Sequence, residues 1–266
     1  MPEAHHCSYP QRETFGSGSI VKYRLASKPA YLVRGQRNIQ TLNRPSPDMG
    51  SEGFMLMVMK NFWNFQPRDA LKFEKDKTGR LKAPAPGTES HPASQRYWLL
   101  THNLYHQYLS TAHYANALAA KYYSLFNERL ERQPLGNWAT VQLWKYMRVN
   151  MLESATVSLD GPRMLELNPN YADAYWEFDL FAFTLIYGQP KVLNRRAYQA
   201  QDNFFSMTDR YLKSAWKEFD WDGPAADSDW DENFGSRFSR ELAKFSRDTD
   251  FDERSAAGFF GAMLFG

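Results

Sequence analysis

The feature that most constrains the fold is a stretch of helical apolar spacing that begins near Gln95 and continues to the last residues. A stripe of apolar residues opens it, and their intervals of three or four match one face of a helix: Tyr97, Leu100, Leu104 and Tyr108. Caps and turn residues divide the rest into further helices. We predict them from the Ser110-Thr111 cap to Pro134, from Thr140 to Gly161-Pro162, and over about 172–187, 195–219 and 236–247.

Two of these helices carry further expectations. The helix that opens at Thr140 has one apolar face, made by Trp144, Met147, Met151 and Ala155. A last helix is predicted to begin near Ser255, after two acidic residues that are typical of a helix start. Because eleven apolar or glycine residues follow Ser255 up to the end of the sequence, we expect this helix to be cut off about three turns in.

The N-terminal third is expected to hold a small β-hairpin. Residues 20–25 alternate apolar and polar, Ser27-Lys28-Pro29 predicts a turn, and residues 30–33 predict a second strand, so that 20–35 form a β-hairpin. Residues 36–43 predict a short helix ended by the proline-rich stretch 44–47. Residues 36–94 as a whole are expected to contain short helices and a loop, and residues 1–13 a flexible N-terminus. The chain is predicted to be a single, mainly α domain with 95–266 as its helical part.

Composition excludes several classes of protein. Of the 266 residues, 43% are apolar and 16% aromatic, which is enough for a packed core. The net charge of +2 gives no whole-molecule reason to bind nucleic acid. The single cysteine, Cys7, excludes an internal disulfide framework and any multi-cysteine metal site. No apolar stretch is long enough to span a membrane and no signal pattern opens the sequence, so we expect a soluble, intracellular chain.

Three histidines form the first candidate site. His102, His106 and His113 would share one face of a continuous helix, and two such histidines can bind a transition metal. Ser110-Thr111 predicts a helix break, however, which would remove His113 from the set. The competing interpretation is that these histidines are bonded to neighbouring polar groups.

Other motifs predict structure more readily than chemistry. The acidic stretch 227–232 begins like a calcium loop but has Glu232 where the sharp turn requires glycine, so we interpret it as a solvated loop. Gly258 and Gly261 suggest a close approach to the backbone of the last helix, and tight helix packing explains them equally well. The methionine- and aromatic-rich segment 54–65 is interpreted either as the lining of an apolar ligand pocket or as ordinary core.

The order of several segments is more specific than any one of them. They are the hairpin and short helix 21–43, residues 59–69 with the turn 76–79, residues 102–110, residues 159–169 with Tyr175-Trp176, residues 219–236 and the tail 259–266. In this order they resemble the N-terminal half of a fungal cytochrome P-450, a haem-thiolate monooxygenase, of the branch related to sterol 7α-hydroxylases and prostacyclin synthase. The resemblance runs from about residue 14 to the end.

The resemblance implies an incomplete cytochrome P-450 fold that stops in the long central helix. The complete family member would hydroxylate an apolar substrate with O2, a haem cofactor and electrons from an NADPH-cytochrome P-450 reductase. The family holds its haem through a cysteine in a Phe-x-x-Gly loop, and Cys7 does not match that loop. Its Glu-x-x-Arg pair and its N-terminal membrane anchor are also missing. We therefore expect a chain that binds haem weakly or not at all and is inactive by itself. The family usually resides in the endoplasmic reticulum membrane, whereas this chain as written is expected to be cytoplasmic.

The resemblance to the family also suggests site residues. It implies contacts between the haem propionates and His102 or His106, and substrate contacts at Met55, Met57, Phe62 and Phe183. No catalytic or metal-ligating residue is expected. The substrate would be a lipophilic small molecule, as in fungal secondary metabolism. Two alternatives remain open: a non-enzymatic helical protein that binds a partner or an apolar ligand, and a histidine-ligated metalloprotein.

Overall fold

The computed structural model describes residues 20–25, 28–43, 50–132, 136, 138 and 140–265. The described chain is mainly helical, with a small two-stranded antiparallel sheet near the N-terminus, which confirms the predicted fold class. It divides into two compact units, residues 1–53 and 54–266. The prediction of a single domain stays a prediction, as does that of a flexible segment 1–13, which lies outside the described residues.

The first unit contains the β-hairpin. Strands β1 (Ile20–Leu25) and β2 (Lys28–Val33) pair antiparallel, with Ile20 opposite Val33 and Leu25 opposite Lys28. The prediction that Lys28 and Pro29 form the turn is wrong, because both are already in the second strand; the residues between the strands lie outside the described part. Helix α2 (Gln36–Leu42) follows Gly35, as predicted, and its expected stop at 44–47 is likewise not described.

Two helices lie within residues 36–94, where the sequence predicts short helices without their bounds. They are α3 (Glu52–Asn61) and α4 (Pro67–Lys75), the second with a proline at its first position, where the missing N–H has no helical partner to lose. The turn that follows is built on Asp76, which is buried and accepts hydrogen bonds from the backbone N–H groups of Thr78 and Trp98.

The helical part begins with an interrupted helix. Helix α5 (Tyr97–Tyr105) follows the short 3₁₀ turn η1 (Ala93–Gln95) and continues into a single π-helical turn, η2 (His106–Ser110). Thr111 then takes an extended conformation with φ −76° and ψ 139°, and α6 (Ala112–Glu131) begins after it. The predicted break at Ser110-Thr111 is therefore confirmed.

The remaining elements complete the second unit. In order they are α7 (Leu143–Asp160), α8 (Arg163–Leu167), α9 (Tyr171–Leu180), α10 (Ala182–Ile186), α11 (Arg195–Glu218), β3 (Trp230–Asp231), β4 (Gly235–Ser236), α12 (Arg237–Asp248), α13 (Glu253–Ala262) and η3 (Met263–Phe265). The single helix predicted over 172–187 is wrong, because the backbone leaves helical geometry at Phe181 and divides it into α9 and α10.

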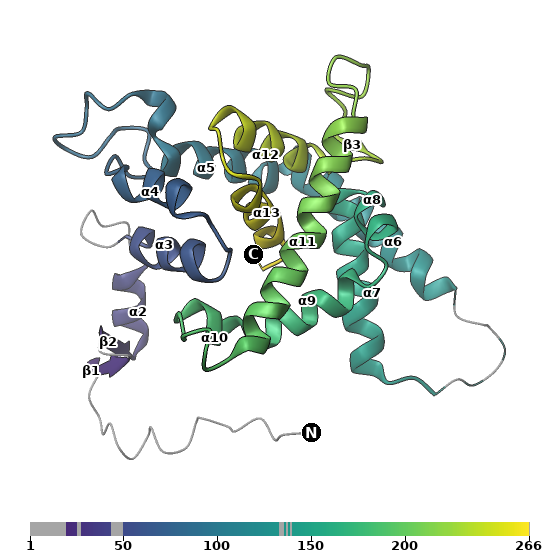
Figure 1. Ribbon diagram of the computed structural model, residues 1–266, viewed down its shortest axis with the longest axis horizontal. Coiled ribbons are helices and arrows are strands. Elements are labelled where there is room, and N and C mark those ends of the chain that lie inside the picture. Colours follow the sequence, from purple (N-terminus) through teal and green to yellow (C-terminus); the bar gives the residue numbers. More distant parts are fainter. Residues whose placement is uncertain are drawn as a thin grey trace. The chain divides into compact units, whose positions relative to one another are not determined.

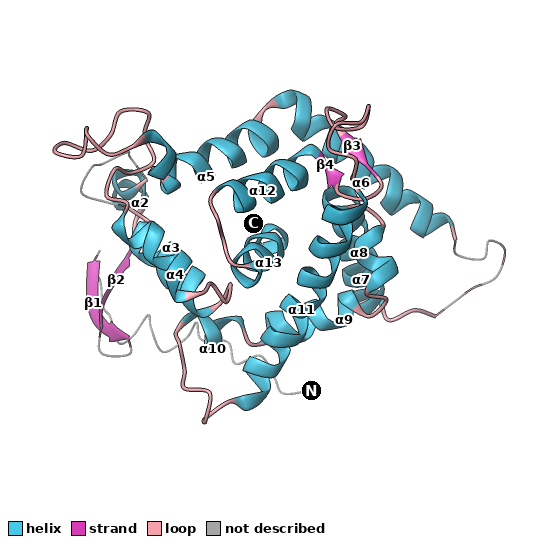
Figure 2. Ribbon diagram, turned by 45° about the horizontal axis from the view of Figure 1, so that its top comes forward, coloured by secondary structure: helices cyan, strands magenta, loops and turns pink. Residues whose placement is uncertain are grey.

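The core of the second unit surrounds α13. Figure 2 shows α13 with α4 on one side and α11 on the other, while α12 runs above it. Aromatic rings connect these helices; Phe259 of α13 lies 6.0 Å from Phe73 of α4 and 6.1 Å from Phe245 of α12 between ring centroids. Such pairs add to the free energy gained by burying the rings, by about 0.5–1.5 kcal/mol each.

Helix α7 buries several polar side chains in its second half, beside Leu152 and Val157, and exposes apolar side chains in its first half. Its second half buries polar side chains, namely Ser154, Thr156, Ser158 and Asp160, each at most 2% exposed. Its first half exposes Leu143, Trp144 and Met151, with Trp144 75% exposed. Neighbouring α6, which lies beside α7 in Figure 1, contains no buried residue. The apolar face predicted for α7 is therefore largely uncovered in this unit.

Candidate functional site

Helix α13 is the buried centre of the second unit. Seven of its ten residues are buried, including both glycines. A side chain at Gly258 would strike the carbonyl oxygen of Trp63, and one at Gly261 would lie 2.7 Å from the ring of Phe205. Close packing against protein therefore explains these two glycines, and they define where α13 must lie.

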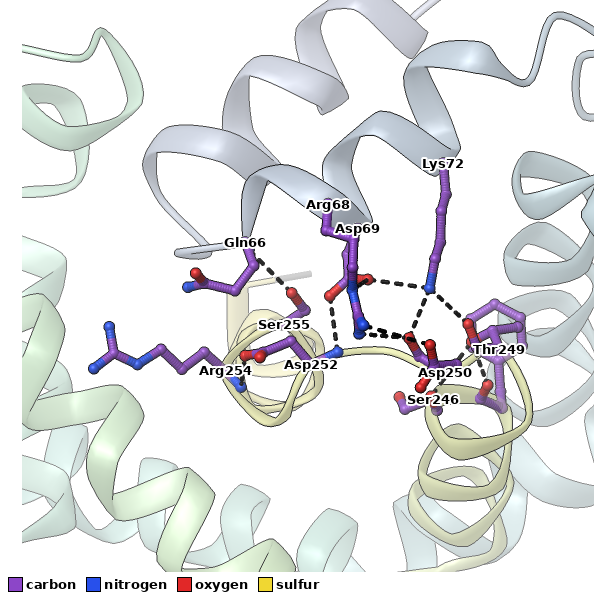
Figure 3. A network of polar contacts seen from close by, with 11 residues as sticks. Gln66, Arg68, Asp69, Lys72, Ser246, Thr249, Asp250, Asp252, Arg254 and Ser255 are labelled. Atoms are coloured by element: carbon purple, nitrogen blue, oxygen red, sulfur yellow. Dashed lines mark hydrogen bonds and ion pairs between the residues drawn. The ribbon is translucent and has the colours of Figure 1, made fainter.

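A cluster of charged and polar groups, the polar junction, holds the N-terminal end of α13 against α4 (Figure 3). Asp69 of α4 is fully buried, and its carboxylate accepts a hydrogen bond of 2.8 Å from the backbone N–H of Asp252. The hydroxyl of Ser255 accepts one of 3.0 Å from the N–H of Gln66. Each bond joins residues more than 180 positions apart in the sequence.

Lys72 connects the same junction to the end of α12. Its ammonium group lies 3.1 Å from the Asp69 carboxylate and donates to the carbonyl oxygens of Thr249 and Asp250, both at 2.7 Å. These carbonyls follow the last turn of α12, where a cation is favoured by the helix dipole. Arg68 donates to the Asp250 carbonyl as well, at 2.8 Å. The polar junction thus joins three helices at one point.

A second polar cluster lies at the carboxyl end of α7, and we refer to it as the α7 end cluster. The last helical carbonyls, which have no partner within the helix, accept hydrogen bonds from three other elements. The indole N–H of Trp230 donates to Ser158 at 3.0 Å, the hydroxyl of Ser239 to Leu159 at 2.7 Å, and that of Tyr211 to Asp160 at 2.7 Å.

The side chain of Asp160 lies inside this cluster. It is fully buried, and its Oδ1 atom is 3.1 Å from the Ser239 hydroxyl, whereas Oδ2 has no hydrogen-bond partner among the described residues. Burial raises the pKa of Asp160 to about 8, although the contact with Ser239 opposes the shift. In the described part of the chain no basic side chain forms an ion pair with Asp160. A neutral carboxyl group is therefore favoured at pH 7.

The three histidines separate as predicted. His102 and His106 are both exposed, and their rings lie 6.2 Å apart across the junction of α5 and η2. His113, beyond the break, contacts the Asp229 carboxylate at 3.0 Å. Among the described residues, no group of three His, Cys, Asp or Glu side chains could hold a metal ion.

The four residues expected to contact the substrate differ widely in their exposure to solvent. Phe62 is 3% exposed and stacks within the core, and Met55 packs against that core while partly buried. Met57 is half-buried, and Phe183 is 78% exposed on α10. Whether they contact a substrate stays a prediction.

The acidic loop serves structural roles. Asp227 pairs with Arg237 at 2.9 Å, and Asp231 accepts the backbone N–H of Asn233 at 2.7 Å. Sequence reasoning missed both the polar junction and the α7 end cluster. Neither cluster has a local sequence signal. Asp69 is an acid in the first turn of a helix, where acids are common, and Asp160 is the last residue of a helix before Gly-Pro.

Comparison with known proteins shows which proteins the chain is related to. The chain is 39% identical over 250 residues to the cytochrome P450 monooxygenase calL of Penicillium decumbens, a match that covers 94% of the chain and 47% of that protein. It is 25% identical over 254 residues to the cytochrome P450 monooxygenase fsoE of Humicola fuscoatra, of which it covers 40%. A third such protein, efuG of Hormonema carpetanum, is 30% identical over 98 residues.

No protein-family model matches the chain, and neither does any solved structure. The chain spans 47% of the length of the Penicillium decumbens protein and 40% of that of the Humicola fuscoatra protein. Within the described residues, the helices are too short or too polar for any of them to cross a lipid bilayer. The mainly helical fold with a small N-terminal sheet agrees with the resemblance seen in the sequence. The chain is therefore related to the fungal cytochrome P450 monooxygenases and corresponds to about half of one.

Proposed function

We propose that the chain forms the substrate-side half of a fungal cytochrome P450 that oxidises a lipophilic compound. The observation that supports this most strongly is the 39% identity to calL over 94% of the chain. The complete enzyme would insert one oxygen atom of O2 into a C–H bond, with electrons from an NADPH-dependent reductase. A role in secondary metabolism is part of the same proposal.

The residues described do not by themselves suit a haem. The family ligates its haem through a cysteine thiolate. The only cysteine of the sequence, Cys7, lies outside the described residues, so these contain no thiolate donor. His102 and His106 are exposed, which suits contacts with a charged group at a surface better than an enclosed axial position. We therefore propose no oxygen-activating step for this chain alone.

Within this proposal, His102 and His106 stay the candidates for propionate contacts. Met57 and Phe183 are the more accessible of the four candidates for substrate contacts, because Met55 and Phe62 are engaged in the core. A lipophilic substrate fits side chains of this kind, since methionine and phenylalanine offer only apolar contact surface.

The first test is spectroscopic. The purified chain is mixed with haem, reduced and exposed to carbon monoxide, and the Soret band is recorded. We expect no band of the thiolate-ligated type, because no suitable cysteine is present. A thiolate-type band would show that the chain holds a reactive centre of its own and would contradict the proposal.

The second test asks whether the chain can serve as half of an enzyme. The chain is fused to the part of the Penicillium decumbens protein that the match leaves out. We expect the reduced, carbon monoxide-bound chimera to show the thiolate-type band that the chain alone lacks. The control is the same chimera with the ligating cysteine replaced by serine. A folded chimera that binds haem without thiolate ligation would count against the proposed role.

A second function is favoured by one observation, the exposed apolar side chains of Leu143, Trp144 and Met151 on α7. Such surface is typical of a protein that binds a partner. A non-enzymatic binding protein of this kind would unfold cooperatively without haem and stay monomeric. Aggregation of the isolated chain would instead favour the half-enzyme.

A further inference from the structure

The Ser239 hydroxyl can be bonded to both of its neighbours at once only if Asp160 carries a proton. If Asp160 is ionised, Ser239 can donate to the carboxylate, but it then gives up its bond to the carbonyl of Leu159. A serine hydroxyl carries one hydrogen and can donate it only once, although it can accept twice. The Ser239 hydroxyl lies 2.7 Å from the carbonyl of Leu159, a group that can only accept. When that bond is made, the 3.1 Å contact with Asp160 Oδ1 is a hydrogen bond only if the carboxyl group donates.

The groups that face Asp160 give no reason for it to be ionised. Tyr171 and Tyr211 face it from α9 and α11, and burial raises the pKa of each well above its ordinary value, so both stay neutral. Asp231, on β3, is an acid that interacts electrostatically with Tyr211. Arg240, from α12, directs its guanidinium to the carbonyl oxygens of Ser228 and Gly235. Asp160 also lies at the negative end of the α7 dipole, which opposes a further negative charge.

Two serines connect the buried carboxyl group to a cavity. The hydroxyls of Ser239 and Ser236 are 3.3 Å apart. Ser236 lines a cavity of about 30 Å³, together with Tyr108, Asp229 and Arg237 among others. That is enough room for a water molecule with polar partners. The side chain of Asp229 is 41% exposed, so the cavity lies near the surface of the unit.

We propose that Asp160 is a buried proton-binding site that exchanges its proton with solvent through Ser239, Ser236 and a water in this cavity. The inference does not depend on the proposed monooxygenase role. The transfer moves protons only. The Ser239 hydroxyl first turns from the Leu159 carbonyl toward Ser236. The Asp160 O–H bond then breaks as its proton joins the Ser239 oxygen, the former Ser239 proton passes to Ser236, and that of Ser236 passes to the water. A carboxylate and a hydrated proton remain.

Proton release has a structural consequence because the surroundings of Asp160 cannot adjust. Gly161, next in the chain, has φ +82°, and a side chain there would lie 2.6 Å from the carbonyl oxygen of Glu232 and 2.9 Å from the nitrogen of Gly235. Backbone therefore packs directly on backbone. A carboxylate needs hydrogen-bond donors or water, so ionisation favours opening of the contact between the end of α7 and the β3–β4 turn.

The direction of the pH dependence follows from the pKa of Asp160, which burial raises from 3.8 to about 8 in the folded chain. The folded chain therefore holds a proton that the unfolded chain releases. The contribution of protonated Asp160 to the free energy of unfolding is fully present below about pH 4 and is lost as the pH rises to about 8. Above that pH the contribution does not change further. Between pH 5 and 7 the unfolding constant should rise tenfold per pH unit relative to Asp160→Asn, which cannot ionise.

The experiment measures this proton directly. Infrared spectra of the chain at pH 6.5 should contain a protonated carboxyl band that disappears in Asp160→Asn and persists in the control Asp222→Asn, since Asp222 is exposed. After mixing with D2O the band should shift promptly in the original chain and several-fold more slowly in Ser236→Ala. Circular dichroism checks that each variant is folded.

Two results would overturn the proposal. An Asp160→Asn variant whose infrared spectrum and pH dependence of unfolding equal those of the original chain would show that Asp160 is already ionised. Exchange at an unchanged rate in Ser236→Ala, with the band still present, would exclude the path through the two serines. Because asparagine is close in size to aspartic acid and can donate to Ser239, the first variant is expected to fold.

Discussion

At the scale of single residues, Gly161 and Gly235 show how closely the chain approaches itself. Both have positive φ, +82° and +64°, and each lies where a Cβ atom would meet backbone atoms of the other segment. A flexible side chain could move aside, but backbone that is held by its own hydrogen bonds cannot. The contact between the end of α7 and β4 therefore tolerates glycine alone.

Substitution measures this directly. We expect Gly161→Ala to lower the free energy of unfolding by about 2–5 kcal/mol, which combines the cost of a positive φ with that of displaced backbone. Urea denaturation followed by circular dichroism gives the value. The matched control is Gly79→Ala, because Gly79 has φ +75° but open space around it, and only about 1–3 kcal/mol is expected there. Equal losses would mean that the close contact does not exist.

At the scale of elements, the polar junction determines where α13 begins. Asp69 is the only group in it that both accepts from the start of α13 and pairs with the cation at the end of α12. Its charge is compensated by Lys72, and the lysine in turn satisfies two carbonyl groups. The three helices are thus connected through one buried carboxylate, whereas α13 contributes little polar surface of its own.

Removing that charge should loosen α13. We expect Asp69→Asn to lower the free energy of unfolding by about 2–4 kcal/mol, because Lys72 then loses its partner in a mostly buried place. Hydrogen exchange at the amide of Asp252 should become faster. Asp209→Asn is the control, since Asp209 pairs with Lys213 on the surface and less than about 1 kcal/mol is expected. Unchanged exchange at Asp252 would contradict the assigned role of Asp69.

Prediction from the sequence succeeded where the signal is local. Helix α11 was expected over 195–219 and is Arg195–Glu218, because the apolar spacing is regular and Asn194 caps it by accepting from the N–H of Ala197. The break at Thr111 was equally visible. The segment with α3 is apolar at nearly every position, so no helical period stands out there, and the sequence predicts short helices in this region without their bounds.

Prediction failed where a distant partner decides the outcome. No pattern near Asp160 indicates that Tyr211, Trp230 and Ser239 will satisfy the end of α7. The same holds for Asp69, whose partner Asp252 is 183 positions away. The division of α9 from α10 at Phe181 has no glycine or proline to announce it. The candidate haem and substrate contacts were inferred from the resemblance to a family, and their roles stay predictions.

At the scale of the whole molecule, the uncovered apolar residues of α7 agree with a chain about half as long as its relatives. Leu143 and Trp144 are 68% and 75% exposed, and α6 beside them buries no residue. A helix normally covers its apolar stripe with another layer of structure. In this unit the described residues supply that layer only for the second half of α7.

The exposed surface should be detectable in solution. We expect Leu143→Ser combined with Trp144→Ser to reduce both binding of a hydrophobic dye and self-association, while the free energy of unfolding changes by no more than about 0.5 kcal/mol per site. Dye fluorescence and sedimentation velocity measure the two effects. Leu81→Ser is the control, because Leu81 is 76% exposed but lies apart in a loop. Equal effects from the control would contradict the assignment of dye binding and self-association to the apolar surface of α7.

The α7 end cluster also has a consequence for the order in which the chain acquires its structure. The donors that complete α7 come 51, 72 and 80 residues later in the sequence. At a synthesis rate of about 5–20 residues per second, the last of them leaves the ribosome about 4–16 s after the end of α7. During that interval the final turn of α7 has water in place of Tyr211, Trp230 and Ser239. Its completion is thus a late event, and a nascent chain that pauses before Ser239 would present an unfinished helix to chaperones.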